Sequence, residues 1–149
     1  MEKYSVYDIA NWFLSKESMS PKKLQKLVYY FEAWGNALLD ESLIDNTQFQ
    51  AWVHGPVSPE LYYRYKEYGW RDIPKTENND AIFNSKVLDL LESVWLTYGE
   101  ETANGLESMT HDELPWQKAR QGLNPLENSD RIIDNKDMAE YYRSIYIGD

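Results

Sequence analysis

The stretch AWVHGPVSPELY at residues 51–62 combines a short apolar segment, a Gly-Pro break and a helix start. Aromatic and β-branched residues before the break partly alternate with polar ones, which is typical of a short strand. Gly55-Pro56 is expected to end that strand. Ser58 directly before Pro59 predicts a capped helix, because a serine cap and a proline in the first turn both favour helix initiation. The chain therefore changes here from extended structure to helix.

Outside this stretch, the pattern is that of a mainly α domain. Apolar residues recur at helical spacing in most segments, and Pro, Gly and Asn separate them. We expect a compact bundle of about six or seven helices, with at most one short β-strand or hairpin near residues 48–57. A single domain covering residues 1–149 accounts for this length. The predicted helices lie near residues 6–16, 21–40, 59–69, 84–98, 100–108, 114–121 and 135–145.

Local signals place several helix ends and one loop. Ser20, which is followed by proline, predicts a strong helix start. Thr110 and Glu113 match a capping box, in which each side chain accepts a hydrogen bond from the other residue's amide. Asn135 is expected to cap the last helix. The polar residues 70–80 are expected to form a flexible loop.

Composition excludes several classes of protein. The chain has no cysteine, which rules out disulfides, thiolate metal sites and cysteine nucleophiles. No apolar run approaches the ~20 residues that span a bilayer, and the N-terminus has no secretory pattern. We therefore expect a cytoplasmic protein with no membrane partner.

The net charge of −10 is unevenly distributed. Residues 1–75 carry nine Lys/Arg and ten Asp/Glu, a net of −1, whereas residues 76–149 carry six and fifteen, a net of −9. Phosphate binding needs clustered positive charge, so nucleic acid is disfavoured as the main ligand. An acidic surface attracts a basic protein partner, although it also serves solubility alone.

No arrangement of residues indicates catalysis, a metal or a cofactor. The two histidines, His54 and His111, are far apart in the sequence and lack the spacing of a metal site. Ser58 lies near His54, but no oxyanion hole or orienting acid accompanies the pair. We expect His54 to be a buried or half-buried imidazole that fixes the turn, and His111 to hydrogen-bond locally at a helix start. The chain is not expected to be an enzyme.

A cluster of lysines raises DNA binding as an alternative function. Lys22, Lys23 and Lys26 lie at the start of one helix, as in helix-turn-helix proteins. Without arginine and within an acidic chain, the cluster is better interpreted as a solvated helix face beside Tyr29 and Tyr30.

Nearly the whole chain resembles the Panacea antitoxin domain, which includes SocA-like antitoxins and phage-associated GepA-like proteins. The resemblance rests on five motifs: YDIANWFL at 7–14, SPKKLQKLVYY at 20–30, AWVHGPVSPELY at 51–62, VWLTYG at 94–99 and THDELPWQKAR at 110–120.

This resemblance implies an antitoxin that neutralises a protein toxin encoded by a neighbouring gene, often within a prophage. One branch of the family instead acts as an adaptor that delivers its toxin to a protease. Autoregulation by DNA binding is a further alternative. The residues expected to contact a partner are Lys26, Tyr30, Trp52, His54, Tyr62, His111 and Trp116; for each, a purely structural role is the competing interpretation.

Overall fold

The computed structural model describes residues 2–146, which form seven α-helices, one two-stranded sheet and two short 3-10 helices. The helices are α1 (Val6–Lys16), α2 (Pro21–Leu38), α3 (Pro59–Tyr65), α4 (Ser85–Tyr98), α5 (Ala103–His111), α6 (Leu114–Ala119) and α7 (Asn135–Ile145). The strands are β1 (Gln50–Trp52) and β2 (Gly55–Val57), and the 3-10 helices are η1 (Lys66–Tyr68) and η2 (Asp80–Ile82). The expected mainly α fold is confirmed. No helix in the described part combines the length and the apolar character needed to cross a bilayer.

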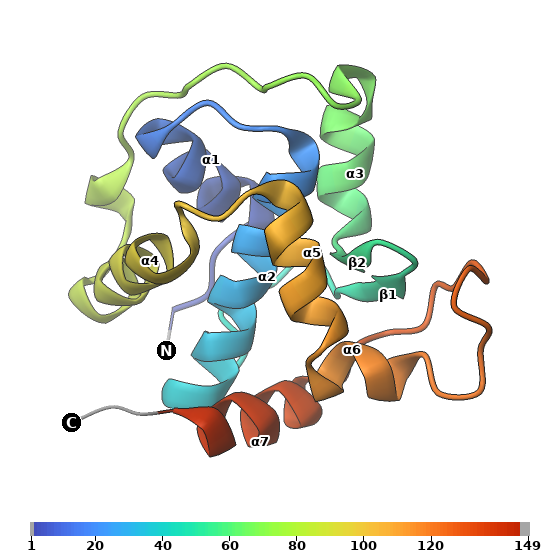
Figure 1. The fold of residues 1–149 in the computed structure, drawn as a ribbon. Helices are drawn as coiled ribbons and strands as arrows, with labels where there is room; N and C mark the ends of the chain where they lie inside the picture. Colours follow the sequence, from blue (N-terminus) through green and yellow to red (C-terminus); the bar gives the residue numbers. More distant parts are fainter. Residues whose placement is uncertain (1, 147–149) are drawn as a thin grey trace.

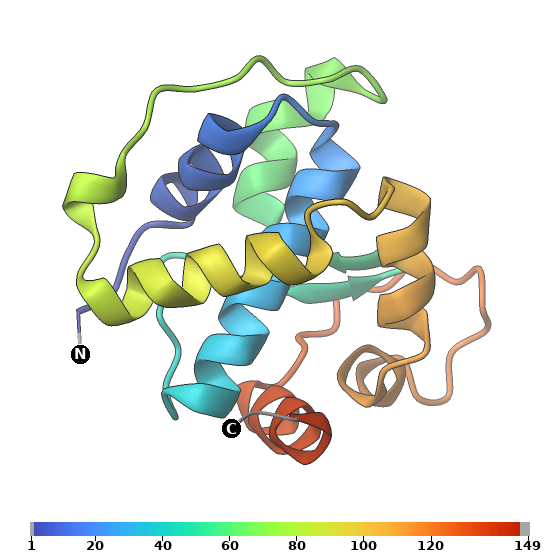
Figure 2. The same cartoon turned by 60° about the vertical axis from the view of Figure 1, so that its left-hand side comes forward.

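Helix α2 forms the centre of the molecule, with α1, α4, α5, α7 and the hairpin around it (Figures 1 and 2). Its start is the predicted one, because the Ser20 side chain accepts a hydrogen bond from the Lys23 amide and Pro21 opens the helix. Thirteen of its eighteen residues are buried. Only its first turn, Trp34 and Leu38 reach solvent, so most of the helix has no solvated face.

The expected solvated face of α2 is therefore wrong. Lys26, Tyr29 and Tyr30 are all buried. Their helical spacing placed them away from the apolar stripe that includes Leu24 and Leu27, and this was interpreted as exposure. In the structure α5, α7 and β2 cover that second face, so burial around α2 is nearly complete.

The hairpin pairs β1 with β2 in antiparallel register, with Gln50 opposite Val57 and Trp52 opposite Gly55. Gly55-Pro56 does not end the extended structure as expected, but opens its second strand. Gly55 adopts a φ of 113°, which L-residues rarely accept. The other edge of β1 is also occupied, because the Ala51 amide donates to the Arg131 carbonyl at 2.8 Å. The hairpin therefore has a third extended neighbour from the C-terminal part of the chain.

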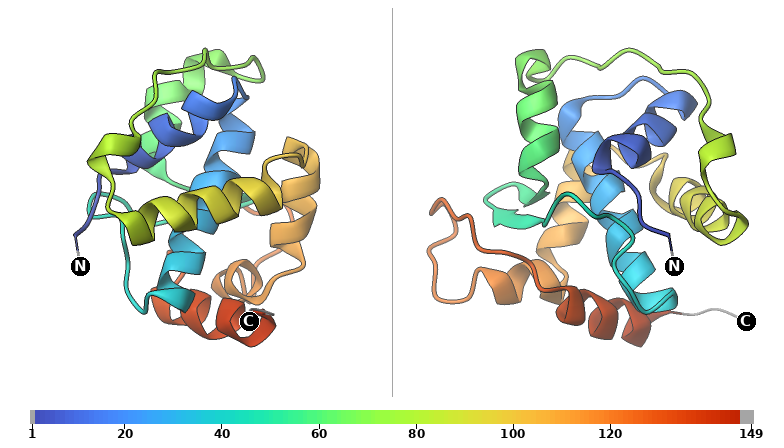
Figure 3. Two further views of the ribbon diagram at one scale, coloured as in Figure 1. Left: turned by 90° about the vertical axis from the view of Figure 1, so that its left-hand side faces the viewer. Right: turned by 180° about the vertical axis from the view of Figure 1, so that it is seen from behind.

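That neighbour belongs to the long connection from α6 to α7. Figure 3 shows residues 120–132 projecting beside the hairpin before the chain returns to α7. Arg120 anchors the connection from inside: its guanidinium donates to the carbonyls of Ala51, Asn124 and Glu127.

The predicted flexible loop at residues 70–80 is tied to the body at several points. Ile73 is buried and its amide donates to the Met19 carbonyl at 2.7 Å. Further along, the Thr76 hydroxyl donates to the Asn11 carbonyl, and Asp80 accepts the indole N–H of Trp12 at 2.7 Å. These contacts close the molecule over α1.

Two predicted helix caps are wrong. Helix α5 begins after Thr102 and continues to His111, so Thr110 lies in its last turn rather than before a new helix. No side chain caps α6, because the Glu113 carboxylate binds two tyrosine hydroxyls instead. At α7 the cap is Asp134 and not Asn135. At α7 the neighbouring Asp134 accepts from the amides of the first turn, whereas at α6 the Glu113 carboxylate is taken by tertiary partners; local sequence shows neither outcome.

Candidate functional site

Three segments far apart in the sequence meet at the hairpin. From α2, the Gln25 side chain donates to the Ser58 carbonyl at 2.9 Å and accepts from the Ser58 amide at 2.8 Å. The Gln25 amide therefore binds both backbone polar groups of Ser58, the residue that caps α3. From α6, the indole N–H of Trp116 donates to the Trp52 carbonyl at 2.8 Å. These contacts fix the hairpin relative to both helices.

Lys26 lies directly beneath the turn. A Cβ placed on Gly55 would be 2.6 Å from Lys26 Cε and 3.1 Å from Thr110 Oγ1. Only glycine fits this position, for steric reasons and because of its positive φ. Burial lowers the pKa of Lys26 to about 7, with Lys22 repelling its charge in addition and Glu107 partly offsetting both effects.

Glu107 of α5 joins α2 to the tip of the hairpin. Its carboxylate forms an ion pair with Lys22 and accepts a contact of 3.2 Å from His54 Nδ1. Burial raises the pKa of Glu107, but the hydrogen bonds from Lys22 and His54 outweigh it, and the net pKa lies below the usual value. His54 itself is exposed, with 74% of its side chain accessible. The expectation of a buried or half-buried His54 is therefore wrong.

His111 and Trp116 form a stacked pair beside the hairpin. Their ring centroids are 4.1 Å apart with an interplanar angle of 15°. Burial lowers the pKa of His111, although Glu107 and the Val53 carbonyl favour its protonated form. His111 lies at the end of α5 and not at a helix start as predicted. It therefore helps to close the space between α5, α6 and β1.

The same segments carry the sequence motifs, and comparison with known families confirms their origin. The family described as antitoxin SocA-like, Panacea domain, matches residues 24–117. The chain belongs to this family. No curated protein and no solved structure shows significant similarity to the chain.

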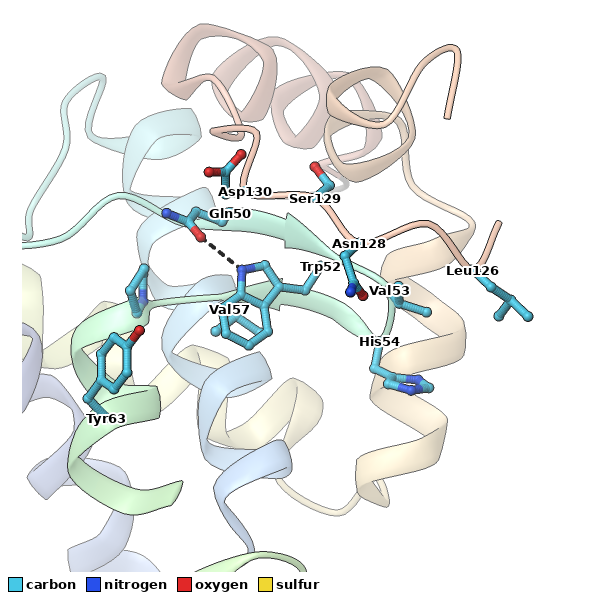
Figure 4. Close-up of a pocket in the computed structure, with 11 residues that line it drawn as sticks. Gln50, Trp52, Val53, His54, Val57, Tyr63, Leu126, Asn128, Ser129 and Asp130 are labelled. Carbon is cyan, nitrogen blue, oxygen red and sulfur yellow. Dashed lines mark hydrogen bonds between the residues drawn. The ribbon is translucent and has the colours of Figure 1, made fainter. Parts of the chain in front are cut away.

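In this Panacea domain, the matched region includes Gln25, the hairpin and Trp116, but not Arg120 or the connection after it. A groove lies between these two parts. Its lining includes Gln50, Trp52, His54, Tyr63, Leu126 and Asp130. Figure 4 shows Trp52 between Tyr63 of α3 on one side and Asn128 of the connection on the other. The Panacea hairpin thus forms the floor of a groove, and a segment outside the family match forms one wall.

Two aromatic side chains, Trp52 and Tyr63, line the groove, and Tyr62 lies beside them. The Trp52 and Tyr62 rings are 4.9 Å apart, and Tyr62 contacts Tyr63 at 5.5 Å. The Trp52 indole N–H donates to the Gln50 side chain at 2.9 Å, which orients the ring along the strand. Tyr63 is 69% exposed. Trp, Tyr and Arg are enriched at protein–protein contacts, so this groove has the composition of a binding surface.

A second cluster lies on the buried side of the Panacea domain. Glu113 Oε1 accepts hydrogen bonds from Tyr30 at 2.8 Å and from Tyr142 at 2.7 Å, and Tyr142 also contacts the Tyr29 hydroxyl. The Tyr30 ring stacks on Tyr98 at 4.0 Å. Burial raises the pKa of Glu113, opposed by the two tyrosine hydrogen bonds. This network joins α2, α4, α6 and α7.

The seven predicted partner-contact residues therefore divide into three groups. On or beside the groove, His54 and Tyr62 are exposed and Trp52 is half-buried; His111 and Trp116 are half-buried behind it, and Lys26 and Tyr30 are buried. Sequence reasoning did not single out Glu107 or Arg120 as contributors. The only sequence feature that pointed to Arg120 is its place as the last residue of the THDELPWQKAR motif at 110–120.

The other chemical alternatives find little support in the positions of their residues. The Ser58 hydroxyl contacts Thr47 at 2.8 Å and caps α3, whereas His54 contacts Glu107. Among the described residues no cluster suitable for a metal ion occurs. Lys23 donates to the Gly99 carbonyl and Lys22 to Glu107, so the predicted lysine cluster is engaged within the protein.

Proposed function

We propose that this Panacea domain is an antitoxin that neutralises a protein toxin encoded by a neighbouring gene, by direct binding and without chemistry of its own. Family membership supports the antitoxin role. The observation that carries the binding mode is the groove at the hairpin, where Trp52 of β1 and His54 of the turn lie beside Tyr62 of α3 and contacts from α2, α5 and α6 fix the hairpin.

Substitutions of Trp52, His54 and Tyr62 are expected to change partner contact more than they change the stability of the fold. Trp52 accepts the Trp116 hydrogen bond through its backbone carbonyl, so Trp52→Ala removes the indole and leaves that bond possible. His54 contacts Glu107 from an exposed position, where an ion pair contributes little to stability. Tyr62 is 40% exposed on α3. Substitutions here mainly test contact.

The experiment is co-expression of the neighbouring gene product with wild-type protein and with Trp52→Ala, His54→Ala and Tyr62→Ala. We expect wild type to restore growth, and at least one folded variant to lose about tenfold or more in affinity, as for an interface hot spot. Leu96→Ala is the control, because Leu96 is 86% exposed on α4 and does not line the groove. Circular dichroism and thermal melting establish folding.

The results distinguish the remaining modes of action. Full rescue by all three folded variants overturns the assignment of the groove. Toxin that stays present but inactive supports sequestration, whereas a shortened toxin half-life indicates delivery to a protease. Failure of the wild-type chain to protect cells from the neighbouring product contradicts the antitoxin role for this gene pair.

A further inference from the structure

A surface of different character continues from the groove along α3. Tyr63, Arg64, Lys66, Trp70 and Arg71 are exposed, and we call this set the α3 ridge. Trp70 is 88% exposed, which is unusual for the largest apolar side chain. Exposed Trp and Tyr combined with Arg is the composition of interface hot spots. Exposed side chains of this kind are typical of a surface that contacts a partner.

The cations of the ridge are held in place but not neutralised. The Arg64 guanidinium lies 3.6 Å from the centre of the Tyr7 ring, and Lys66 lies 5.3 Å from that of Tyr63. Arg71 donates to the carbonyls of Glu67 and Tyr68. None of these three cations belongs to an ion pair found among residues 2–146. Their positive charge therefore faces outward in an ordered arrangement.

The ridge is continuous with the groove. Tyr63 lines the groove and belongs to the ridge, and the contacts from Trp52 to Tyr62 and from Tyr62 to Tyr63 link the two. A partner seated on the hairpin would reach Lys66 in η1 and Trp70 in the following turn, the segments that come directly after α3. The chain as a whole is acidic, with a net charge of −10. An acidic partner segment is repelled by that net charge and attracted at the ridge, which would define its orientation.

We propose that the α3 ridge binds an acidic segment of the toxin that also carries an aromatic or large apolar side chain. The carboxylates pair with Lys66 and Arg71, and the apolar side chain packs on Trp70. This inference rests on the proposed antitoxin function. Nucleic acid is the less suitable ligand, because Glu67 and Asp72 interrupt the three cations and leave no continuous basic track for a phosphate backbone, whereas one or two carboxylates need only Lys66 and Arg71.

Two variants test the ridge. Lys66→Glu with Arg71→Glu reverses its charge, and Trp70→Ala removes its apolar contact; all three positions are exposed, so the fold should tolerate both variants. The matched control is Lys86→Glu with Lys136→Glu, two exposed lysines elsewhere whose replacement changes the net charge equally. The first probe is a displayed library of random short peptides, which requires no knowledge of the toxin. Wild type and control should enrich peptides that combine Asp or Glu with an aromatic residue, and both ridge variants should lose this enrichment.

The second probe is the neighbouring gene product. We expect the charge-reversed variant to bind it about tenfold or more weakly, and with a smaller dependence on salt. If wild type and ridge variants bind equally, the ridge is overturned while the antitoxin function stands. If the neighbouring product does not bind at all, the function fails for that pair, and the peptide selection still decides the ridge. Absence of an acidic bias in the peptides, or DNA retardation that requires Lys66 and Arg71, overturns the proposal.

Discussion

The indole nitrogen of Trp116 donates a hydrogen bond of 2.8 Å to the backbone carbonyl of Trp52. This bond spans 64 residues of sequence and joins α6 to β1. It makes the position of the hairpin dependent on α6, although the two are not neighbours in the chain. The groove residues Val53 and His54, which follow Trp52 in the turn, are therefore positioned by a tertiary contact.

Trp116→Phe keeps an aromatic ring that can stack on His111 but removes the N–H donor. We expect a loss of about 1–2 kcal/mol in the free energy of unfolding, because the part-buried Trp52 carbonyl loses its partner. Trp95→Phe is the control: it makes the same change at a half-buried tryptophan whose indole nitrogen has no hydrogen bond within the described chain. Urea unfolding measures both. Equal destabilisation of the two variants would show that the hydrogen bond contributes nothing beyond ring size.

Comparing alanine substitutions at Gly55 and Gly122 distinguishes the cost of steric overlap from the cost of backbone strain. Both have positive φ, 113° and 87°, but a Cβ on Gly55 would overlap Lys26, whereas nothing lies within 4 Å of one on Gly122. We expect Gly122→Ala to cost about 1 kcal/mol from strain alone. Gly55→Ala should cost at least about 2 kcal/mol more, because Lys26 and Thr110 are buried and cannot move freely. Thermal unfolding of the two variants gives the comparison, and similar melting temperatures would contradict the steric account.

The helices were predictable because their signals are local. The caps at Ser20 and Ser58, each followed by proline, need only adjacent residues, and the structure confirms both. Caps failed where two polar residues compete for the same role, as for Asp134 and Asn135. The prediction of a short strand or hairpin near residues 48–57 is confirmed by the β1–β2 pair, but Gly55-Pro56 was expected to end the extended structure, since Gly-Pro is more often a stop than the beginning of a second strand.

The organisation of the site was less accessible to sequence. Burial of Lys26 and Tyr30 follows from the elements that surround α2, and periodicity on one helix does not contain that information. Glu113 was assigned to a local cap, whereas its partners Tyr30 and Tyr142 lie 83 and 29 residues away. Polar residues within an almost entirely buried helix are therefore the places where local interpretation fails, because their partners are tertiary.

The Glu113 network allows acceptor and charge to be tested separately. Glu113→Gln keeps an oxygen that can accept from Tyr30 and Tyr142, whereas Glu113→Ala leaves both hydroxyls without it. We expect Glu113→Ala to lose about 2–4 kcal/mol, since each unpaired buried hydroxyl is costly. Glu113→Gln should be as stable as wild type near neutral pH or more so, because no buried charge forms.

The pH dependence gives the sign of the Glu113 contribution. Burial raises the folded-state pKa of Glu113, so its contribution to stability is fully present below the unfolded pKa and is lost as pH rises through the folded value. The stability of Glu113→Gln relative to wild type should therefore increase as pH rises above about 4.5. Urea unfolding at pH values from acid to neutral measures this difference. A constant or decreasing difference would contradict a raised pKa.

Lys26 provides the corresponding test at higher pH. Its pKa is about 7 in the folded protein and 10.5 when unperturbed, so between these values the unfolded state binds more protons. The cost of burying the ammonium is fully present below about pH 7 and disappears towards pH 10.5. A shift of this size corresponds to about 3–5 kcal/mol. Lys26→Met keeps a side chain of similar shape without the charge, and should be more stable than wild type by up to that amount at pH 6.

The advantage of Lys26→Met should shrink steadily between pH 7 and about 10 as wild type loses the buried charge. Taking the difference between variant and wild type removes the contribution of the buried tyrosines, which is common to both proteins and begins near pH 10, where tyrosines of the unfolded chain ionise. Lys86→Met, at an exposed lysine of α4, should show no such trend. Urea unfolding at several pH values gives all three curves. A pH-independent difference for Lys26→Met, or a variant less stable than wild type at pH 6, would mean that the ammonium beneath Gly55 is stabilised by partners stronger than Glu107.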